Sequence, residues 1–68
     1  MTTEAALLMQ FRDRMMPYAG QAGTELQATV LKHGLDIVKQ LQTNHGHALA
    51  DSVSLLRAVL RELNIRTI

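Results

Sequence analysis

Apolar residues recur with the period of an α-helix in three segments of the chain, and two breaks separate these segments. The breaks span residues 17–23 and 43–47 and contain the single proline and three of the four glycines. The first segment predicts a helix over about residues 3–16, which Thr2 or Thr3 caps and Pro17 ends. Its apolar residues, at spacings of three, four and three, line one face: Leu8, Phe11, Met15 and Tyr18.

The second segment predicts a helix over about residues 25–43. Thr24 and Gln27 have the spacing of a capping box, in which each side chain bonds the backbone amide of the other residue. Gly34 falls within the apolar half of this helix, which is made up of Leu26, Val30, Leu31, Leu35, Ile37, Val38 and Leu41. A glycine inside a helix costs about 1 kcal/mol relative to alanine. Either another backbone approaches Gly34 closely, or the position is simply tolerated.

The third segment predicts a helix over about residues 48–65 with an uninterrupted apolar row over two heptads. The row consists of Leu49, Val53, Leu56, Leu60 and Leu63. None of the three segments shows the two-residue alternation of a strand. We therefore predict a single all-α domain over residues 1–68, with a short N-terminal helix followed by a hairpin of two longer helices.

The apolar arcs of the second and third helices are wide, about 160–180°, whereas a helix of a simple hairpin needs about 100°. A chain of 68 residues offers little surface of its own to cover both arcs. We therefore expect a homodimeric helical bundle, or a complex with another protein that covers the same faces. Its interface would be formed by Val30, Gly34, Ile37, Leu41, Leu49, Val53, Leu56, Leu60 and Leu63. The first helix would contact another protein through Leu8, Phe11, Met15 and Tyr18, or fill the core of its own dimer.

Composition narrows the class of protein further. Hydrophobic residues make up 47% of the chain and charged residues 19%, which excludes an intrinsically disordered chain. Aromatic residues make up only 3%, too few for the stacking platforms that bind single-stranded nucleic acid. The longest apolar run is five residues, far short of a membrane span, and no basic N-terminal segment indicates a signal peptide. We expect a cytoplasmic protein with no membrane partner.

Catalytic and metal-binding chemistry has few residues available. His45, His47 and Asp51 could supply three metal ligands, but the chain has no cysteine and a polar inter-helix loop explains the same residues. Ser52 follows Asp51 directly, and adjacent helical residues point about 100° apart, which does not suit a nucleophile with its orienting carboxylate. No glycine-rich phosphate loop occurs. We therefore expect no enzyme activity, no metal and no cofactor.

The residues Ala50-Asp51-Ser52, followed by a run from Val53 to Leu56, resemble the Asp-Ser-Leu region of acyl carrier proteins. In that family the serine carries phosphopantetheine at the start of a helix, so the resemblance implies this role for Ser52. It covers about seven residues, and the two helices that follow the serine-bearing helix in the family have no counterpart here. Asp and Ser before an amphipathic helix also serve as capping residues.

Two function classes remain after these exclusions. We expect a small protein–protein interaction module, such as an inhibitor, anti-activator, adaptor or small chaperone of a larger complex, that binds through apolar helix faces. The alternative is a small dimeric DNA-binding transcriptional regulator that contacts nucleic acid through Arg57 and Arg61, which share a helix face. A net charge of +1 and a pI near 8.3 are low for nucleic-acid binding, so we favour the first class.

Overall fold

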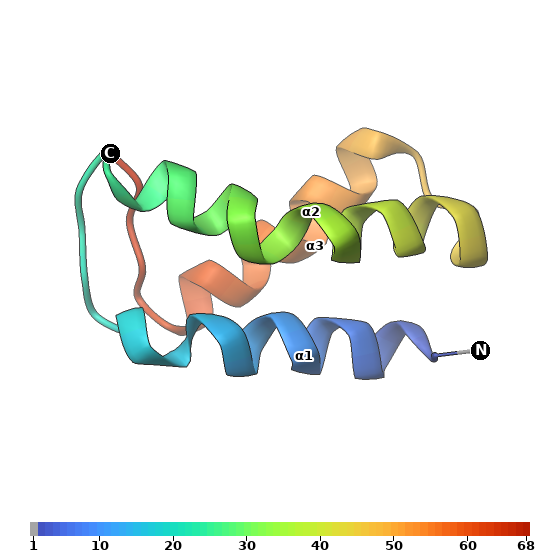
Figure 1. The fold of residues 1–68 in the computed structure, drawn as a ribbon, viewed down its shortest axis with the longest axis horizontal. Helices are drawn as coiled ribbons and strands as arrows, with labels where there is room; N and C mark the ends of the chain where they lie inside the picture. The colour runs from blue at the N-terminus through green and yellow to red at the C-terminus, as the bar shows by residue number, and fades with distance from the viewer. Residues whose placement is uncertain (1) are drawn as a thin grey trace.

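Three α-helices form the fold of residues 2–68, which the computed structural model describes (Figure 1). α1 spans Glu4–Met15, α2 spans Leu26–His45 and α3 spans Leu49–Glu62, and a 3₁₀ turn (η1) follows α1 at Met16–Tyr18. α1 and α2 run antiparallel, while α3 crosses behind them and returns toward the end of α1 (Figure 1). The all-α prediction and its three helices are confirmed for these residues.

The ends of α1 follow the local sequence. The hydroxyl oxygen of Thr3 accepts a hydrogen bond from the amide of Ala6 at 3.1 Å, and Glu4 lies in the first turn, where the helix dipole favours an acid. The helix changes to the η1 turn just before Pro17, which has no amide hydrogen to continue the ladder. The start of this helix and its end near Pro17 were therefore predicted from local chemistry alone.

The capping box predicted at the start of α2 is wrong. Thr24 takes part only through its backbone, where its carbonyl accepts from the amide of Gln27 at 3.0 Å. The Gln27 side chain instead donates to the carbonyl of Thr67, also at 3.0 Å. A distant segment of the chain therefore competes successfully for a side chain that the local pattern assigned to the helix end.

The C-terminal ends of α2 and α3 shift by two and three residues. α2 continues to His45, two residues beyond the prediction, and ends where Gly46 adopts a left-handed conformation with φ of 69°. α3 ends at Glu62, three residues earlier than predicted, because Asn64 turns the chain with φ of 56°. Asn tolerates this conformation better than most residues. The turn leads Ile65 back into the core.

The hydrophobic core lies between the three helices of one chain. α1 contributes three side chains that are completely buried, and α2, α3 and the tail after α3 supply the others. The core residues are Leu7, Phe11, Met15, Leu26, Ile37, Val38, Leu41, Leu56, Val59, Leu60, Leu63 and Ile65. The accessible surface is 4411 Å², close to the roughly 4,300 Å² expected for a folded monomer of this mass. The wide apolar arcs therefore do not by themselves require a second chain.

The connection between α1 and α2 is held by the C-terminal tail (residues 63–68). The Gly20 amide donates to the Leu63 carbonyl at 2.9 Å, and the Arg66 amide donates to the Gln21 carbonyl at 3.0 Å. The Gly23 amide donates in turn to the Arg66 carbonyl at 2.9 Å. The two segments lie side by side at one end of the molecule (Figure 1). This glycine-containing connection is therefore fixed to the end of the fold.

Within residues 2–68, none of the helices combines the length and apolar character needed to cross a membrane.

Candidate protein-binding surface

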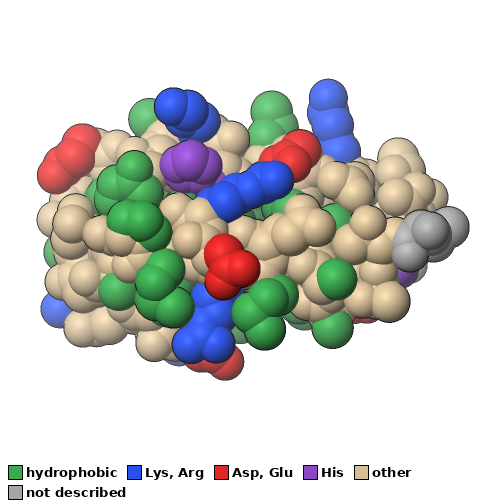
Figure 2. All heavy atoms as spheres, turned by 60° about the horizontal axis from the view of Figure 1, so that its bottom comes forward, with side chains coloured by type: hydrophobic (Ala, Val, Ile, Leu, Met, Phe, Trp, Pro, Cys, Tyr) green, Lys and Arg blue, Asp and Glu red, His purple; other side chains and the backbone are tan. Residues whose placement is uncertain are grey.

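The face of α1 that was expected to bind a partner points mostly into the core. Phe11 and Met15 are fully buried, and Leu8 and Tyr18 are half-buried at its edge. Phe11 and Met15 could reach another protein only if α1 left the bundle. Figure 2 shows the side that carries α1, where hydrophobic side chains are scattered between charged groups rather than gathered in one patch.

Most residues assigned to a dimer interface are also internal. Six of the nine are buried within the single chain: Gly34, Ile37, Leu41, Leu56, Leu60 and Leu63. Val30 and Val53 are half-buried, and only Leu49 is exposed, at 58%. α1 covers the side of the hairpin that the sequence analysis reserved for a second copy. An interface that uses the described conformation must therefore lie elsewhere on the molecule.

Gly34 marks a close approach, although the approaching groups are side chains and not a backbone. A β-carbon at this position would lie 2.9 Å from Cδ1 of Leu56 and 3.1 Å from Cε1 of Phe11. All three helices therefore meet at Gly34, and the missing side chain makes room for the Phe11 ring. Of the two readings that the sequence left open, the structure favours close packing.

His45 and His47 connect the turn between α2 and α3 to the start of α1. Nε2 of His45 lies 2.8 Å from the carbonyl oxygen of Thr2, so this nitrogen carries the hydrogen and donates. Nε2 of His47 lies 3.0 Å from a carboxylate oxygen of Glu4. Asp51 takes no part in these contacts, and no group of three or more potential metal ligands forms within residues 2–68. The two imidazoles therefore act as links between helix ends.

Ser52 cannot serve as the attachment site that the acyl carrier resemblance implies. Its side chain is fully buried, and its hydroxyl donates to the carbonyl of Ala48 at 3.1 Å, one helical turn earlier. A phosphopantetheine group needs a hydroxyl that is accessible to a transferase and to solvent. Asp51 and Ser52 instead lie in the first turns of α3, where Ser52 is buried.

A second polar link joins α1 to α2 at the opposite end from the histidines. Nη1 of Arg14 lies 2.8 Å and 3.0 Å from the two carboxylate oxygens of Asp36 and also donates to the carbonyl of His33 at 2.9 Å. The hydrogen bond from Arg14 lowers the pKa of Asp36 below its usual 3.8. Because both side chains are substantially exposed, we expect a contribution of only about 0.5 kcal/mol to stability.

We expect Asp36→Asn to lower the free energy of unfolding by about 0.5 kcal/mol at pH 7. The pKa of Asp36 is lower in the folded chain than in the unfolded one, so the ion pair stabilises above about pH 3.8 and is lost as pH falls further. Urea titrations at several pH values measure the difference, which should shrink as pH falls below about 3.8. Asp13→Asn is the control, because it makes an equal charge change on α1 at a residue that has no ion pair among the described residues.

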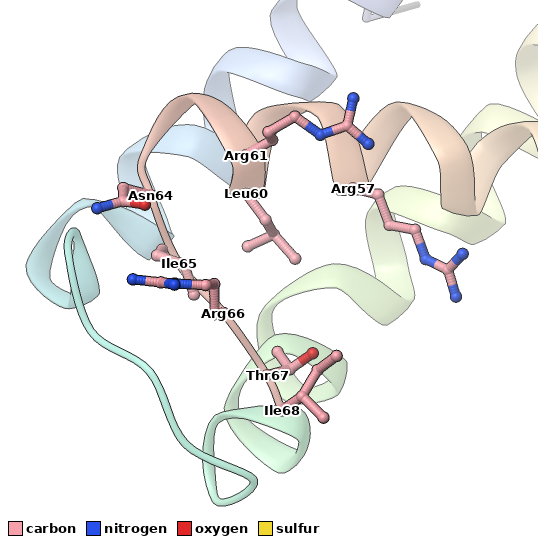
Figure 3. Close-up of a pocket in the computed structure, with 8 residues that line it drawn as sticks. All are labelled: Arg57, Leu60, Arg61, Asn64, Ile65, Arg66, Thr67 and Ile68. Atoms are coloured by element: carbon pink, nitrogen blue, oxygen red, sulfur yellow. The ribbon is translucent and has the colours of Figure 1, made fainter.

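An open groove lies between α3 and the C-terminal tail. It is lined by Arg57, Leu60, Arg61, Asn64, Ile65, Arg66, Thr67 and Ile68. Figure 3 shows Leu60 pointing from α3 toward Thr67 and Ile68, with Arg57 and Arg61 extending from α3 to one side. Ile68 is 95% exposed. The groove therefore combines an apolar floor with basic side chains at its edge.

The sequence analysis identified Arg57 and Arg61 but missed the contribution of the tail. One signal was present, since Ile68 is an apolar residue beyond Ile65, where the predicted helix ends. Periodicity could not show that this segment returns along α3. The groove depends on the hydrogen bonds that fix the tail to the connection after α1.

Comparison with models of protein families finds no match, and no curated protein or solved structure matches the chain. The function is therefore argued from the geometry of this molecule.

Proposed function

We propose that this protein is a non-enzymatic interaction module that binds a partner protein in the groove between α3 and the C-terminal tail. The observation that carries the proposal is the exposed Ile68 beside Leu60 on the floor of the groove, at the edge of which Arg57 and Arg61 extend. Apolar side chains at the centre with polar groups around them are the usual arrangement of a protein interface. Inhibitor, anti-activator, adaptor and small chaperone roles all use such a surface.

The charges favour an acidic amphipathic segment as the bound part of the partner. Arg57, Arg61 and Arg66 form no ion pair with any acid among the described residues. A helix with leucines on one face and glutamates at its margin would place the leucines against Leu60 and Ile68. The arginines would then set its orientation and speed its association, since charges at an interface rim contribute more to these than to affinity.

Nucleic-acid binding by a dimer is the second candidate, and the same unpaired arginines support it. A phosphate backbone would use Arg57 and Arg61 but has no use for Ile68. The two candidates therefore predict different roles for the apolar floor of the groove. The homodimer and the cytoplasmic location that the sequence predicts stay part of the proposal.

Fluorescence anisotropy with two kinds of probe tests the proposal. The probes are a set of 16-residue amphipathic helical peptides of differing acidic content and a duplex DNA of 20 base pairs. We expect the full chain to bind the acidic peptides and Ile68→Asp to weaken this binding at least tenfold. The pair Arg57→Ala and Arg61→Ala should weaken peptide binding only a few-fold. Because Ile68 is almost fully exposed, its substitution leaves the fold intact.

The control is the pair Gln10→Glu and Asn44→Asp, which lowers the net charge by the same two units at exposed positions outside the groove. If DNA binds tightly, loses affinity with Arg57→Ala and Arg61→Ala and ignores Ile68→Asp, the nucleic-acid alternative replaces the proposal. If peptides bind equally well to the Ile68→Asp variant, the groove is not the binding site.

A further inference from the structure

α2 carries a second row of apolar residues beside the row that faces the core. Ala28, Leu31, Leu35 and Val38 recur at spacings of three, four and three. Leu31 and Leu35 are 65% and 56% exposed, although leucine is usually buried. They lie one helical turn apart, so their side chains are neighbours on one outer strip of α2. Ala28 is exposed as well, whereas Val38, at the end of the row, is buried at the edge of the core. We call these four residues the outer row.

The outer row has the spacing of a coiled-coil seam. Extended within α2 by one position, to Gln42, it keeps the alternation of three and four that lets two helices pack along their length. A helix of 20 residues is about 30 Å long. The row itself, from Ala28 to Val38, spans about 16 Å of this length, half of the 32 Å longest dimension of the molecule.

The geometry points to a second copy of this chain, packed antiparallel along the outer row of α2, as its occupant. In an antiparallel pair related by a two-fold axis, Leu31 lies opposite Leu35 of the second copy, and Leu35 lies opposite Leu31. Ala28 then lies over the edge of Val38 of the second copy, whose side chain stays packed in its own core. The row is therefore complementary to its own reversed sequence, as a symmetric dimer requires.

The charged residues beside the outer row agree with the same register. Glu25, Lys32 and Lys39 follow one another at intervals of seven residues and lie on one flank of the row. In the antiparallel pair, Glu25 of each copy meets Lys39 of the other, which gives two ion pairs. All three side chains are exposed, and none forms an ion pair among the described residues. A partner protein without this spacing of acid and base would not match both ends.

One contact in this arrangement is unfavourable. Lys32 lies nearest the two-fold axis and therefore faces Lys32 of the second copy. The long lysine stems let the ammonium groups separate into solvent while their methylenes cover Leu31 and Leu35. The arrangement therefore predicts that removing this charge strengthens the dimer, an outcome that a free helix face would not produce.

The area that such a dimer needs is a small share of the molecular surface. Specific interfaces bury about 600 Å² or more on each copy, roughly one seventh of the 4411 Å² surface. The core residues stay in place, since the second copy adds to α2 from outside. This inference rests on the dimer named in the proposed function but assigns it a surface other than the buried residues expected from the sequence.

Sedimentation or light scattering of the full chain between about 1 and 500 µM tests the assignment. We expect a mass near twice 7.6 kDa at the upper end of this range. The pair Leu31→Asp and Leu35→Asp should give a folded monomer with unchanged helicity. Met9→Asp, an exposed apolar residue on α1, is the matched control and should leave the mass unchanged.

The register has its own test in a mixing experiment. Glu25→Lys and Lys39→Glu should each weaken the dimer about fivefold to tenfold at low salt, and the effect should shrink at 1 M NaCl. Mixed together, the two variants should form a heterodimer at least as stable as the wild-type dimer, because both opposed pairs are then oppositely charged. Lys32→Gln should strengthen the dimer about twofold to fivefold.

A chain that stays at 7.6 kDa at 500 µM overturns both this assignment and the expected homodimer. A dimer that survives Leu31→Asp with Leu35→Asp overturns only the assignment. Peptide binding in the groove is measured separately, and the monomeric variant should retain it, because the groove lies between α3 and the tail. The failure of either proposal can therefore be recognised without reference to the other.

Discussion

Phe11→Ala is expected to lower the free energy of unfolding by about 3–5 kcal/mol, because the ring is completely buried between the three helices. A domain of this length has a total stability of about 3–10 kcal/mol, so a large fraction of the variant should be unfolded at 25 °C. Urea denaturation followed by circular dichroism measures the loss. Met9→Ala, an exposed residue on the same helix, should change stability by about 0.5 kcal/mol or less.

The contact between Phe11 and Gly34 can be tested by combining two substitutions. Gly34→Ala gains up to about 1 kcal/mol of helix propensity, but its β-carbon would crowd Leu56 and the Phe11 ring. We expect it to destabilise the wild-type chain by about 1 kcal/mol. It should cost less in the Phe11→Ala variant, where the ring is gone and the end of the Leu56 side chain can move into the vacated space. Additive effects of the two substitutions would show that Phe11 does not pack against Gly34.

Leu56→Asp is the second substitution with a large expected effect. Leu56 is buried where α3 crosses α2, and an ionised carboxylate there would have no partner. The desolvation cost exceeds the whole stability of a small domain, so we expect loss of the helical circular dichroism signal at pH 7 and not merely a change of mass.

Leu49→Asp is the matched control on the same helix. Both residues belong to the row that the sequence analysis treated as one seam, but Leu49 is exposed and lies in the first turn of α3, where an acid is favoured. This variant should keep its helicity and change stability by about 1 kcal/mol or less. Equal loss of structure in both variants would contradict the core described here.

The three helices could be predicted because the signals that define them are local. Capping by Thr3, the end of α1 before Pro17 and the left-handed Gly46 all depend on a few consecutive residues. The start of α2 was mispredicted because Gln27 has a better partner in Thr67, forty positions away. No pattern within the helix itself contains that information.

The site was only partly predictable. Arg57 and Arg61 follow from helical spacing, but their place beside an apolar groove depends on the tail that returns along α3. Likewise, periodicity correctly placed Leu31 and Leu35 on the apolar half of α2 without showing that the core stops short of them. A wide apolar arc has more than one way to be covered, and the sequence does not state which neighbour covers which part.

The sequence by itself determined the number of helices, most of their ends and the fact that Gly34 interrupts an apolar face. Each of these depends on backbone propensity and on residues within one or two turns. Only the tertiary structure decided that one face of α1 fills the core and that Ser52 is buried. It also decided that His45 and His47 contact the start of α1 and that Leu31 and Leu35 of the outer row are exposed. These outcomes depend on which faces meet in space, because burial is a property of the packed assembly and not of any one segment.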